Sequence, residues 1–174
     1  MAKAVLDALV ARFPAEVHDP YEGLGGDDCT FVAKSHIREV CRFLKTDPSL
    51  AFNMAPYITA VDYLGEDPRF EVVYNLYSTT HNHRVRLRVK VPESDLVLQS
   101  VVPVWRGADW FERYCYDMYG MRFEGHPDMR RLLMYDEFVG WPLRKDYPLR
   151  GRQPLVAERE VKDIYRGPGP FGRD

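Results

Sequence analysis

Apolar and basic residues alternate without interruption along residues 84–91. The apolar positions are Val85, Leu87, Val89 and Val91, and the basic positions are Arg84, Arg86, Arg88 and Lys90. Because successive side chains of a β-strand point to opposite faces of a sheet, this pattern predicts a strand with one buried face and one basic face. Residues 57–64 and 69–78 are also strand-like, and the turn at residues 65–68 predicts an antiparallel hairpin between them.

A helical period appears at two places before these strands. The first apolar stripe is ended by Pro14 and consists of Val5, Leu6, Leu9, Val10 and Phe13. The second has Ser35 as its expected cap, ends at Asp47-Pro48, and consists of Ile37, Val40, Cys41 and Leu44. Residues 16–21, 29–33 and 100–104 are predicted as short strands, and residues 109–119 as a helix that Gly120 ends.

This order of elements predicts an α+β fold, a two-layer sandwich in which two helices from the N-terminal half pack on one mainly antiparallel sheet. The basic positions of residues 84–90 then lie on the other face. After Gly140, prolines and glycines recur among charged residues, and such a sequence holds no regular element for long. We therefore expect an α+β domain at residues 1–140 and an extended, partner-binding tail at residues 141–174. Residues 151–174 are expected to be protease-sensitive in the free chain.

Composition and charge narrow the classes of function. A chain of 174 residues fits one domain, and its net charge of −2 creates no global attraction for nucleic acid or anionic lipid. No apolar run approaches the roughly 20 residues that a membrane-spanning helix needs. Cys29, Cys41 and Cys115 are scattered, with no CxxC pair. Because they are odd in number and scattered, we expect buried thiols in a reducing compartment. Three cysteines this far apart are also too few to hold an iron–sulfur cluster.

Two pairs of residues have the types that carry chemistry. His81 and His83 point the same way in a strand, but a metal site needs further ligands and none lies near in sequence, so a solvated hairpin end is preferred. Glu112 and Asp117 have the types of an acid–base pair, yet a spacing of five places them about 140° apart on a helix. Each is expected instead to pair with an arginine, such as Arg113, Arg130 or Arg131. The sequence contains no Gly-rich phosphate loop and no nucleophile elbow.

Residues 110–148 mix acids, bases, aromatics and turn formers, as expected of a segment that meets a ligand or a partner. The sequence Gly125-His126-Pro127-Asp128 predicts either a tight turn with His126 hydrogen-bonded to backbone, or an interface corner from which Arg130 and Arg131 project. Residues 142–148 predict an extended piece lying on another protein. Two other classes stay open: an RNA-binding domain that uses the basic strand with Tyr74 and Tyr77, and a hydrolase that uses His126 with Glu112 or Asp117.

Together these residues resemble a known family, the 30 kDa (C-type) subunit of respiratory complex I, the proton-pumping NADH:quinone oxidoreductase. The likeness covers roughly residues 30–150 and includes Val61-Asp62-Tyr63-Leu64, the run from Arg69 to Tyr74, and Ala108-Asp109-Trp110. Where the family usually has Glu-Arg-Glu, this chain has Glu112-Arg113-Tyr114. The signature positions are Glu112, Arg113, Asp117, Gly120, Gly125, His126, Pro127, Asp128, Arg130, Arg131, Pro142, Leu143, Arg144, Lys145, Asp146 and Pro148.

The resemblance implies a structural subunit of an enzyme complex, without catalytic, cofactor-binding or metal-binding residues of its own. FMN, iron–sulfur clusters, NADH and quinone are expected on other subunits. The implied partners are the 49 kDa-type subunit, over which the C-terminal segment runs extended, and the ferredoxin-like two-cluster subunit. The implied location is peripheral, on the cytoplasmic face of the inner membrane. The alternative within this lineage is the equivalent subunit of a membrane-bound hydrogenase or another donor's dehydrogenase.

Overall fold

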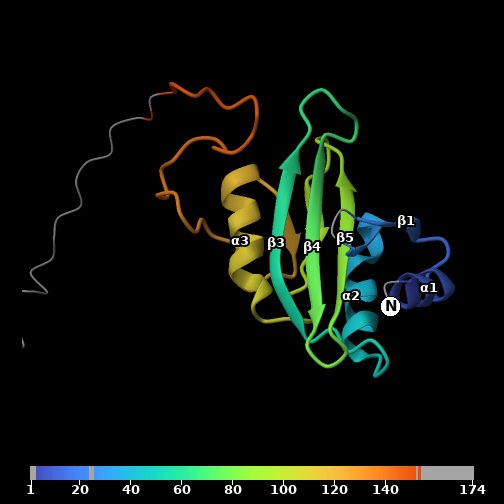
Figure 1. The fold of residues 1–174 in the computed structure, drawn as a ribbon. Helices are drawn as coiled ribbons and strands as arrows, with labels where there is room; N and C mark the ends of the chain where they lie inside the picture. The colour runs from blue at the N-terminus through green and yellow to red at the C-terminus, as the bar shows by residue number, and fades with distance from the viewer. Residues whose placement is uncertain (1–2, 24–25, 152, 154–174) are drawn as a thin grey trace, which may run out of the picture.

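Three long antiparallel strands make up one side of the five-stranded main sheet (Figure 1). The computed structural model describes residues 3–23, 26–151 and 153. Strand β4 (Phe70–Ser78) lies between β3 (Met54–Asp62) and β5 (His83–Val91), and it pairs antiparallel with both. Strand β2 (Asp28–Val32) adds parallel to β5, and β1 (Val17–Glu22) completes the order β1-β2-β5-β4-β3. The sheet is therefore mixed but mostly antiparallel, and the predicted hairpin of β3 and β4 is confirmed.

Helices cover one face of this sheet, which confirms the predicted α+β sandwich. Helix α3 (Ala108–Tyr119) is seen beside β3 and helix α2 (Ile37–Thr46) beside β5 in Figure 1, and both helices contribute to the buried cluster that includes the sheet. Helix α1 (Lys3–Arg12) contributes Val5 and Leu9 to the same buried cluster. A short helical turn, η1 (Lys34–His36), precedes α2, so the predicted Ser35 cap is wrong: His36 holds the cap position without a side-chain hydrogen bond.

The predicted strand at residues 100–104 is also wrong, and the reason is local. The strand lies just before it, as β6 (Val97–Gln99), which pairs parallel with β7 (Arg122–Glu124). Side chains take two of the amides that a neighbouring strand would need: the Glu112 carboxylate accepts from Val101, and the Ser100 hydroxyl accepts from Val102. Residues 101–105 therefore turn into α3 and do not extend the sheet.

Strand β5 divides its side chains between the two faces as its alternation predicts. Leu87 is fully buried and faces Tyr74 of β4 across the sheet register, whereas Arg84 and Lys90 are exposed on the opposite face. Tyr74 therefore belongs to the helix-covered face, at 0% exposure, and it cannot join the basic side chains in an RNA platform. Burying an aliphatic side chain of this size is worth roughly 1.5–3 kcal/mol, so the register of β5 is strongly fixed.

The segment after Gly140 folds back onto the domain as far as the structure describes it. Residues 141–151 pass through successive turns, and the Leu143 amide donates to the Met118 carbonyl at the end of α3 (3.1 Å). Residues 142–148 thus form turns and not the expected extended piece, while their predicted contact with another protein stays a prediction. The rest of the predicted tail, at 152 and 154–174, lies outside the described residues. Within the described residues, no helix is long and apolar enough to cross a membrane.

Truncation of one buried and one exposed side chain of β5 tests this register. Leu87→Ala should lower the free energy of unfolding by about 2–5 kcal/mol, because it leaves a cavity in the core. Lys90→Ala should change it by less than about 0.5 kcal/mol, because that side chain is exposed on the other face. Denaturant unfolding of the two variants measures the difference, and equal losses would contradict the register.

Candidate functional site

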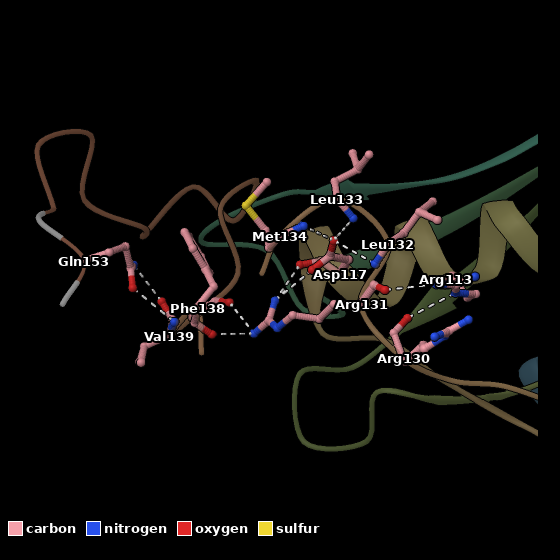
Figure 2. Close-up of polar contacts among 11 residues, drawn as sticks. Arg113, Asp117, Arg130, Arg131, Leu132, Leu133, Met134, Phe138, Val139 and Gln153 are labelled. Atoms are coloured by element: carbon pink, nitrogen blue, oxygen red, sulfur yellow. Dashed lines mark hydrogen bonds and ion pairs between the residues drawn. The ribbon is translucent and has the colours of Figure 1, made fainter. Parts of the chain in front are cut away.

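Asp117, on the last turn of α3, organises the segment that follows β7. Its side chain is fully buried. One carboxylate oxygen accepts hydrogen bonds from the backbone amides of Leu132 (3.1 Å), Leu133 (2.7 Å) and Met134 (2.9 Å), as Figure 2 shows. The other oxygen accepts from the Arg131 guanidinium at 2.8 Å, so the predicted pairing of Asp117 with an arginine is confirmed. Burial alone would raise the pKa of Asp117, but these donors outweigh it and hold that pKa below its usual range.

Arg131 extends this clamp to residues further along the chain. Its guanidinium donates to the carbonyls of Phe138 (2.9 Å) and Gly140 (3.2 Å), and it lies 4.7 Å from the centre of the Trp141 ring. Arg113 of α3 adds hydrogen bonds to the carbonyls of Arg130 (3.2 Å) and Arg131 (3.0 Å). Residues 130–141 lack regular secondary structure, and these charged side chains take its place in satisfying the backbone.

A second ionic cluster holds residues 142–148 against the sheet. Arg69 binds Asp62 through two nitrogens (2.8 and 2.9 Å) and also reaches Glu93 (2.8 Å) and Asp146 (2.9 Å). The hydrogen bonds from Arg69 lower the pKa of Asp62, and the Lys145 amide donates to the same carboxylate at 2.7 Å. The sequence interpretation missed Asp62, Arg69 and Glu93 as members of this site. The available signal was an aspartate at the end of a largely apolar strand.

The Arg144 side chain also makes its contacts within the chain and does not project outward. Its Nε donates to the Tyr119 carbonyl (2.8 Å), and its guanidinium lies over the Phe70 ring at 5.2 Å. Burial lowers the pKa of Arg144 from its ordinary value. Gly120 is required here for two reasons: its φ of +82° favours glycine, and a Cβ would lie 2.7 Å from the Trp141 ring. The end of α3 is thus closely packed against the signature segment.

His126 adopts the tight-turn alternative. Its side chain is fully buried, Nδ1 accepts from the Asp128 amide (3.0 Å), and Nε2 lies 3.3 Å from the Asp109 carbonyl oxygen. Nδ1 is therefore unprotonated and Nε2–H donates. Neither Glu112 nor Asp117 contacts the ring among the described residues, so the structure gives no acid–base pair to the hydrolase interpretation.

Glu112 is buried in the core without the predicted arginine. Oε1 accepts from the Val101 amide (2.7 Å), while Oε2 has no hydrogen-bond partner within the described part of the chain. Arg113 follows Glu112 by one residue, about 100° around the helix, and therefore faces the loop instead. Burial raises the pKa of Glu112 from 4.5 to about 7. This carboxyl group is closed off from solvent, so its protonation state affects the stability of the fold.

No metal centre is formed by the described residues. They contain no group of three or more His, Cys, Asp or Glu side chains placed to hold a metal ion. The rings of His81 and His83 lie 5.6 Å apart, and His81 Nε2 is 3.0 Å from the Pro48 carbonyl oxygen. Cys29, Cys41 and Cys115 are buried and unbridged.

The clamped segment presents an outward surface that is partly apolar. Arg130 keeps 72% of its side chain exposed, and its pairing with Asp128 (2.9 Å) is a surface ion pair. Exposed large apolar side chains gather on the same segment, which we call the 130–149 surface; they are Leu133, Tyr135, Val139, Leu143 and Leu149. Exposed apolar side chains interspersed with charged ones on a segment that is held in place are typical of a protein–protein interface.

Removal of the clamp charge tests the role of Asp117. Asp117→Asn should destabilise the chain by roughly 3–5 kcal/mol, because it leaves Arg131 without its buried counter-ion. Amide hydrogen exchange at residues 132–134 should quicken. Asp128→Asn is the matched control, since its carboxylate is exposed and an exposed pair is worth about 0–1 kcal/mol. Unchanged protection of residues 132–134 in Asp117→Asn would show that the clamp does not hold the loop.

The raised pKa of Glu112 predicts a pH dependence of stability. The folded pKa of Glu112, about 7, lies above its ordinary value of 4.5. The contribution of Glu112 to the free energy of unfolding is therefore largest below pH 4.5 and decreases as the pH rises from 4.5 to 7. The loss amounts to about 3 kcal/mol by the pKa difference. Glu112→Gln should remove this slope and raise the Tm at pH 8 relative to the parent chain. Thermal melts at pH 5 and pH 8 measure it, and parallel pH profiles would refute the assignment.

Comparison of the sequence with known proteins identifies a family that it matches. A model described as respiratory-chain NADH dehydrogenase, 30 Kd subunit, matches residues 30–153. The C-type subunit of the NADH-quinone oxidoreductase of Geobacter sulfurreducens is 48% identical, with 84% of this chain and 90% of that protein covered. The corresponding NADH-quinone oxidoreductase subunit from a Roseiflexus species is 43% identical, with 98% and 96% covered.

Solved structures share the fold. The trypsin-resistant fragment of Nqo5 superposes with a TM-score of 0.63 at 30% identity, over 72% of this chain and 97% of that one. A chain of the membrane-bound sulfane sulfur reductase, an archaeal respiratory membrane complex, gives 0.71 at 22% identity, over 99% and 95%, and shows the common fold alone. On the match of the family model and of these relatives over most of its length, the chain belongs to the family of respiratory-chain NADH dehydrogenase 30 kDa subunits.

Proposed function

We propose that this chain is a structural subunit of the peripheral arm of an NADH:quinone oxidoreductase, in which it positions cluster-bearing subunits for electron transfer coupled to proton translocation. The observation that carries the proposal is that side chains of the family signature bind the backbone of an exposed segment of the same chain. The side chains of Asp117, Arg131 and Arg144 fix the backbone of this segment. The segment carries the exposed, partly apolar 130–149 surface. Relatives that are 42–51% identical are named as the C-type subunits of NADH-quinone oxidoreductases, which supports the same assignment.

The proposed partners are the 49 kDa-type subunit and the ferredoxin-like two-cluster subunit, with the 130–149 surface bound to the first. FMN, the iron–sulfur clusters and the NADH and quinone sites belong to other subunits in this proposal, and this chain contributes no catalytic residue. It associates with the cytoplasmic face of the inner membrane through the complex. The division into a domain at residues 1–140 and a partner-binding tail at 141–174 is kept as part of the proposal, with the tail anchored by the Arg69 cluster.

The sequence alone predicted that both Arg130 and Arg131 project toward a partner, but the structure leaves only the first of these two cations largely exposed. Arg131 and Arg144 are engaged within the chain, so their removal should destabilise the free protein. Arg130, whose ion pair with Asp128 is exposed, and the exposed apolar side chains are the groups placed to meet a partner.

Charge introduced on the 130–149 surface tests the proposal. Val139→Asp with Leu149→Asp should leave the Tm of the free chain nearly unchanged, because both side chains are exposed at 65% and 99%. The same pair should lower the yield of assembled complex and its NADH-to-quinone activity together, since a desolvated carboxylate weakens an apolar interface. Activity per assembled complex should stay normal, because no catalytic group is touched.

Val10→Asp on α1, which lies at the other edge of the sheet from α3, is the control and should assemble normally (Figure 1). Co-purification of the 49 kDa-type subunit and activity per complex are the measurements. Normal assembly with collapsed turnover would overturn the scaffold role and return the segment to a catalytic one.

A further inference from the structure

The first turn of α3 carries an exposed tryptophan. Trp110 is 64% exposed, more than any other aromatic residue that the structure describes. Trp105, just before the same helix, is 5% exposed and donates its Nε1–H to the Phe52 carbonyl (3.1 Å). Trp110 Nε1 makes no hydrogen bond within the described residues. A large aromatic side chain is normally buried over most of its area, so the packing of this core does not account for the position of Trp110.

Arg113 connects this tryptophan to the segment that carries the 130–149 surface. Its guanidinium lies 5.8 Å from the centre of the Trp110 ring. The same guanidinium donates to the carbonyls of Arg130 (3.2 Å) and Arg131 (3.0 Å), as Figure 2 shows. In Figure 1, this segment (orange) lies on the α3 side of the molecule, away from α1. Trp110 is therefore held next to residues 130–131, with one guanidinium between the indole and the backbone.

The helical period places a second aromatic side chain beside Trp110. Tyr114 follows it by four residues, and residues four apart are neighbours on a helix surface. Tyr114 is half-buried and packs against the hydrophobic core. We call the outward side of Trp110, Arg113 and Tyr114 the α3 face.

Two acidic side chains lie close to the α3 face, and each has a basic partner. The Asp109 carboxylate lies 3.4 Å from the buried His126 ring. The Asp128 carboxylate pairs with Arg130 at 2.9 Å. The α3 face itself offers an indole N–H, a guanidinium and a phenol around exposed aromatic area, which suits an apolar partner with hydrogen-bond acceptors.

The 130–149 surface is too small to form an interface alone. A specific interface takes roughly 20–30 residues from each partner. Residues 130–149 number only 20, and Arg131 and Arg144 among them are directed inward. A subunit bound to this surface must therefore also cover neighbouring residues. The α3 face adjoins it and offers tryptophan beside arginine, the residue types that most often dominate the binding energy of an interface.

We propose that the α3 face and the 130–149 surface form one interface, in which the indole of Trp110 inserts into an apolar pocket of the subunit that binds the 130–149 surface. That pocket contains a hydrogen-bond acceptor for the indole N–H, because a buried N–H without an acceptor would weaken binding. This inference rests on the proposed function. It adds to it an anchoring residue and the chemistry of the pocket that receives this residue.

Hydroxyl-radical footprinting of the unaltered protein tests the burial of Trp110. Mass spectrometry should show that oxidation of Trp110 is at least tenfold lower in the purified complex than in the free chain. Tyr57 on β3, which is 46% exposed, is the internal control and should be oxidised equally in both states. Equal oxidation of Trp110 in the two states would overturn the proposal. Protection of Trp110 already in the free chain would assign the α3 face to a second copy or to residues 154–174, and would also overturn it.

Truncation tests the energetics. Trp110→Ala should leave the Tm of the free chain nearly unchanged, because the side chain is exposed. The same change should reduce retention of the chain in the complex at least tenfold, as expected for the loss of an anchoring side chain. Tyr57→Ala removes an exposed aromatic side chain from β3 and is the matched control, which should be retained normally.

Photocrosslinking identifies the occupant. With p-benzoylphenylalanine in place of Trp110 in one variant and of Val139 in another, both assembled complexes should give a crosslink to the same subunit. Crosslinks to two different subunits, or from position 110 to a second copy of this chain, would overturn the single interface.

The remaining outcomes separate this inference from the proposed function. Normal retention of Trp110→Ala beside failed retention of the Val139 and Leu149 variant would overturn the anchoring role of Trp110 and leave the proposed function standing. A chain that co-purifies with no other subunit would overturn both.

Discussion

The 130–149 surface depends on the hydrogen bonds that the buried carboxylate of Asp117 accepts. A segment of about ten residues without regular structure has no ladder of its own to satisfy its backbone, and water cannot replace one where the segment packs on a helix. One buried anion resolves this by accepting three successive amides and a guanidinium. Since the anion lies on the final turn of α3, the geometry of that helix passes directly to the loop.

A second ionic cluster fixes the next part of the chain from the sheet. Arg69 lies between carboxylates of β3, of the region after β5 and of the C-terminal segment. The two clusters meet where Trp141 packs against Arg131 and Arg144. Residues 130–148 are therefore held from a helix on one side and from a strand on the other. This double attachment fixes the course of the segment relative to the rest of the domain.

Much of the fold follows from local patterns. The alternation in β5, the stripe of α2 and the glycine at the end of α3 each appear in a short window of sequence, and the structure has them in those places. The strand expected at residues 100–104 is absent because side chains bind its amides, and one of them, Glu112, belongs to the next helix, 11 residues after Val101. The Asp62 site was missed for a similar reason: its partner amide, Lys145, lies 83 residues away. The family resemblance located the signature but not the direction in which each cation points, which only packing decides.

The Asp117 clamp recognises main-chain atoms and no side chain of residues 132–134. Any residue except proline supplies the amide that the carboxylate accepts. The positions that face outward can therefore change their chemistry while the backbone beneath them keeps its course. In evolutionary terms, substitutions at these outward positions can accumulate without refolding the chain.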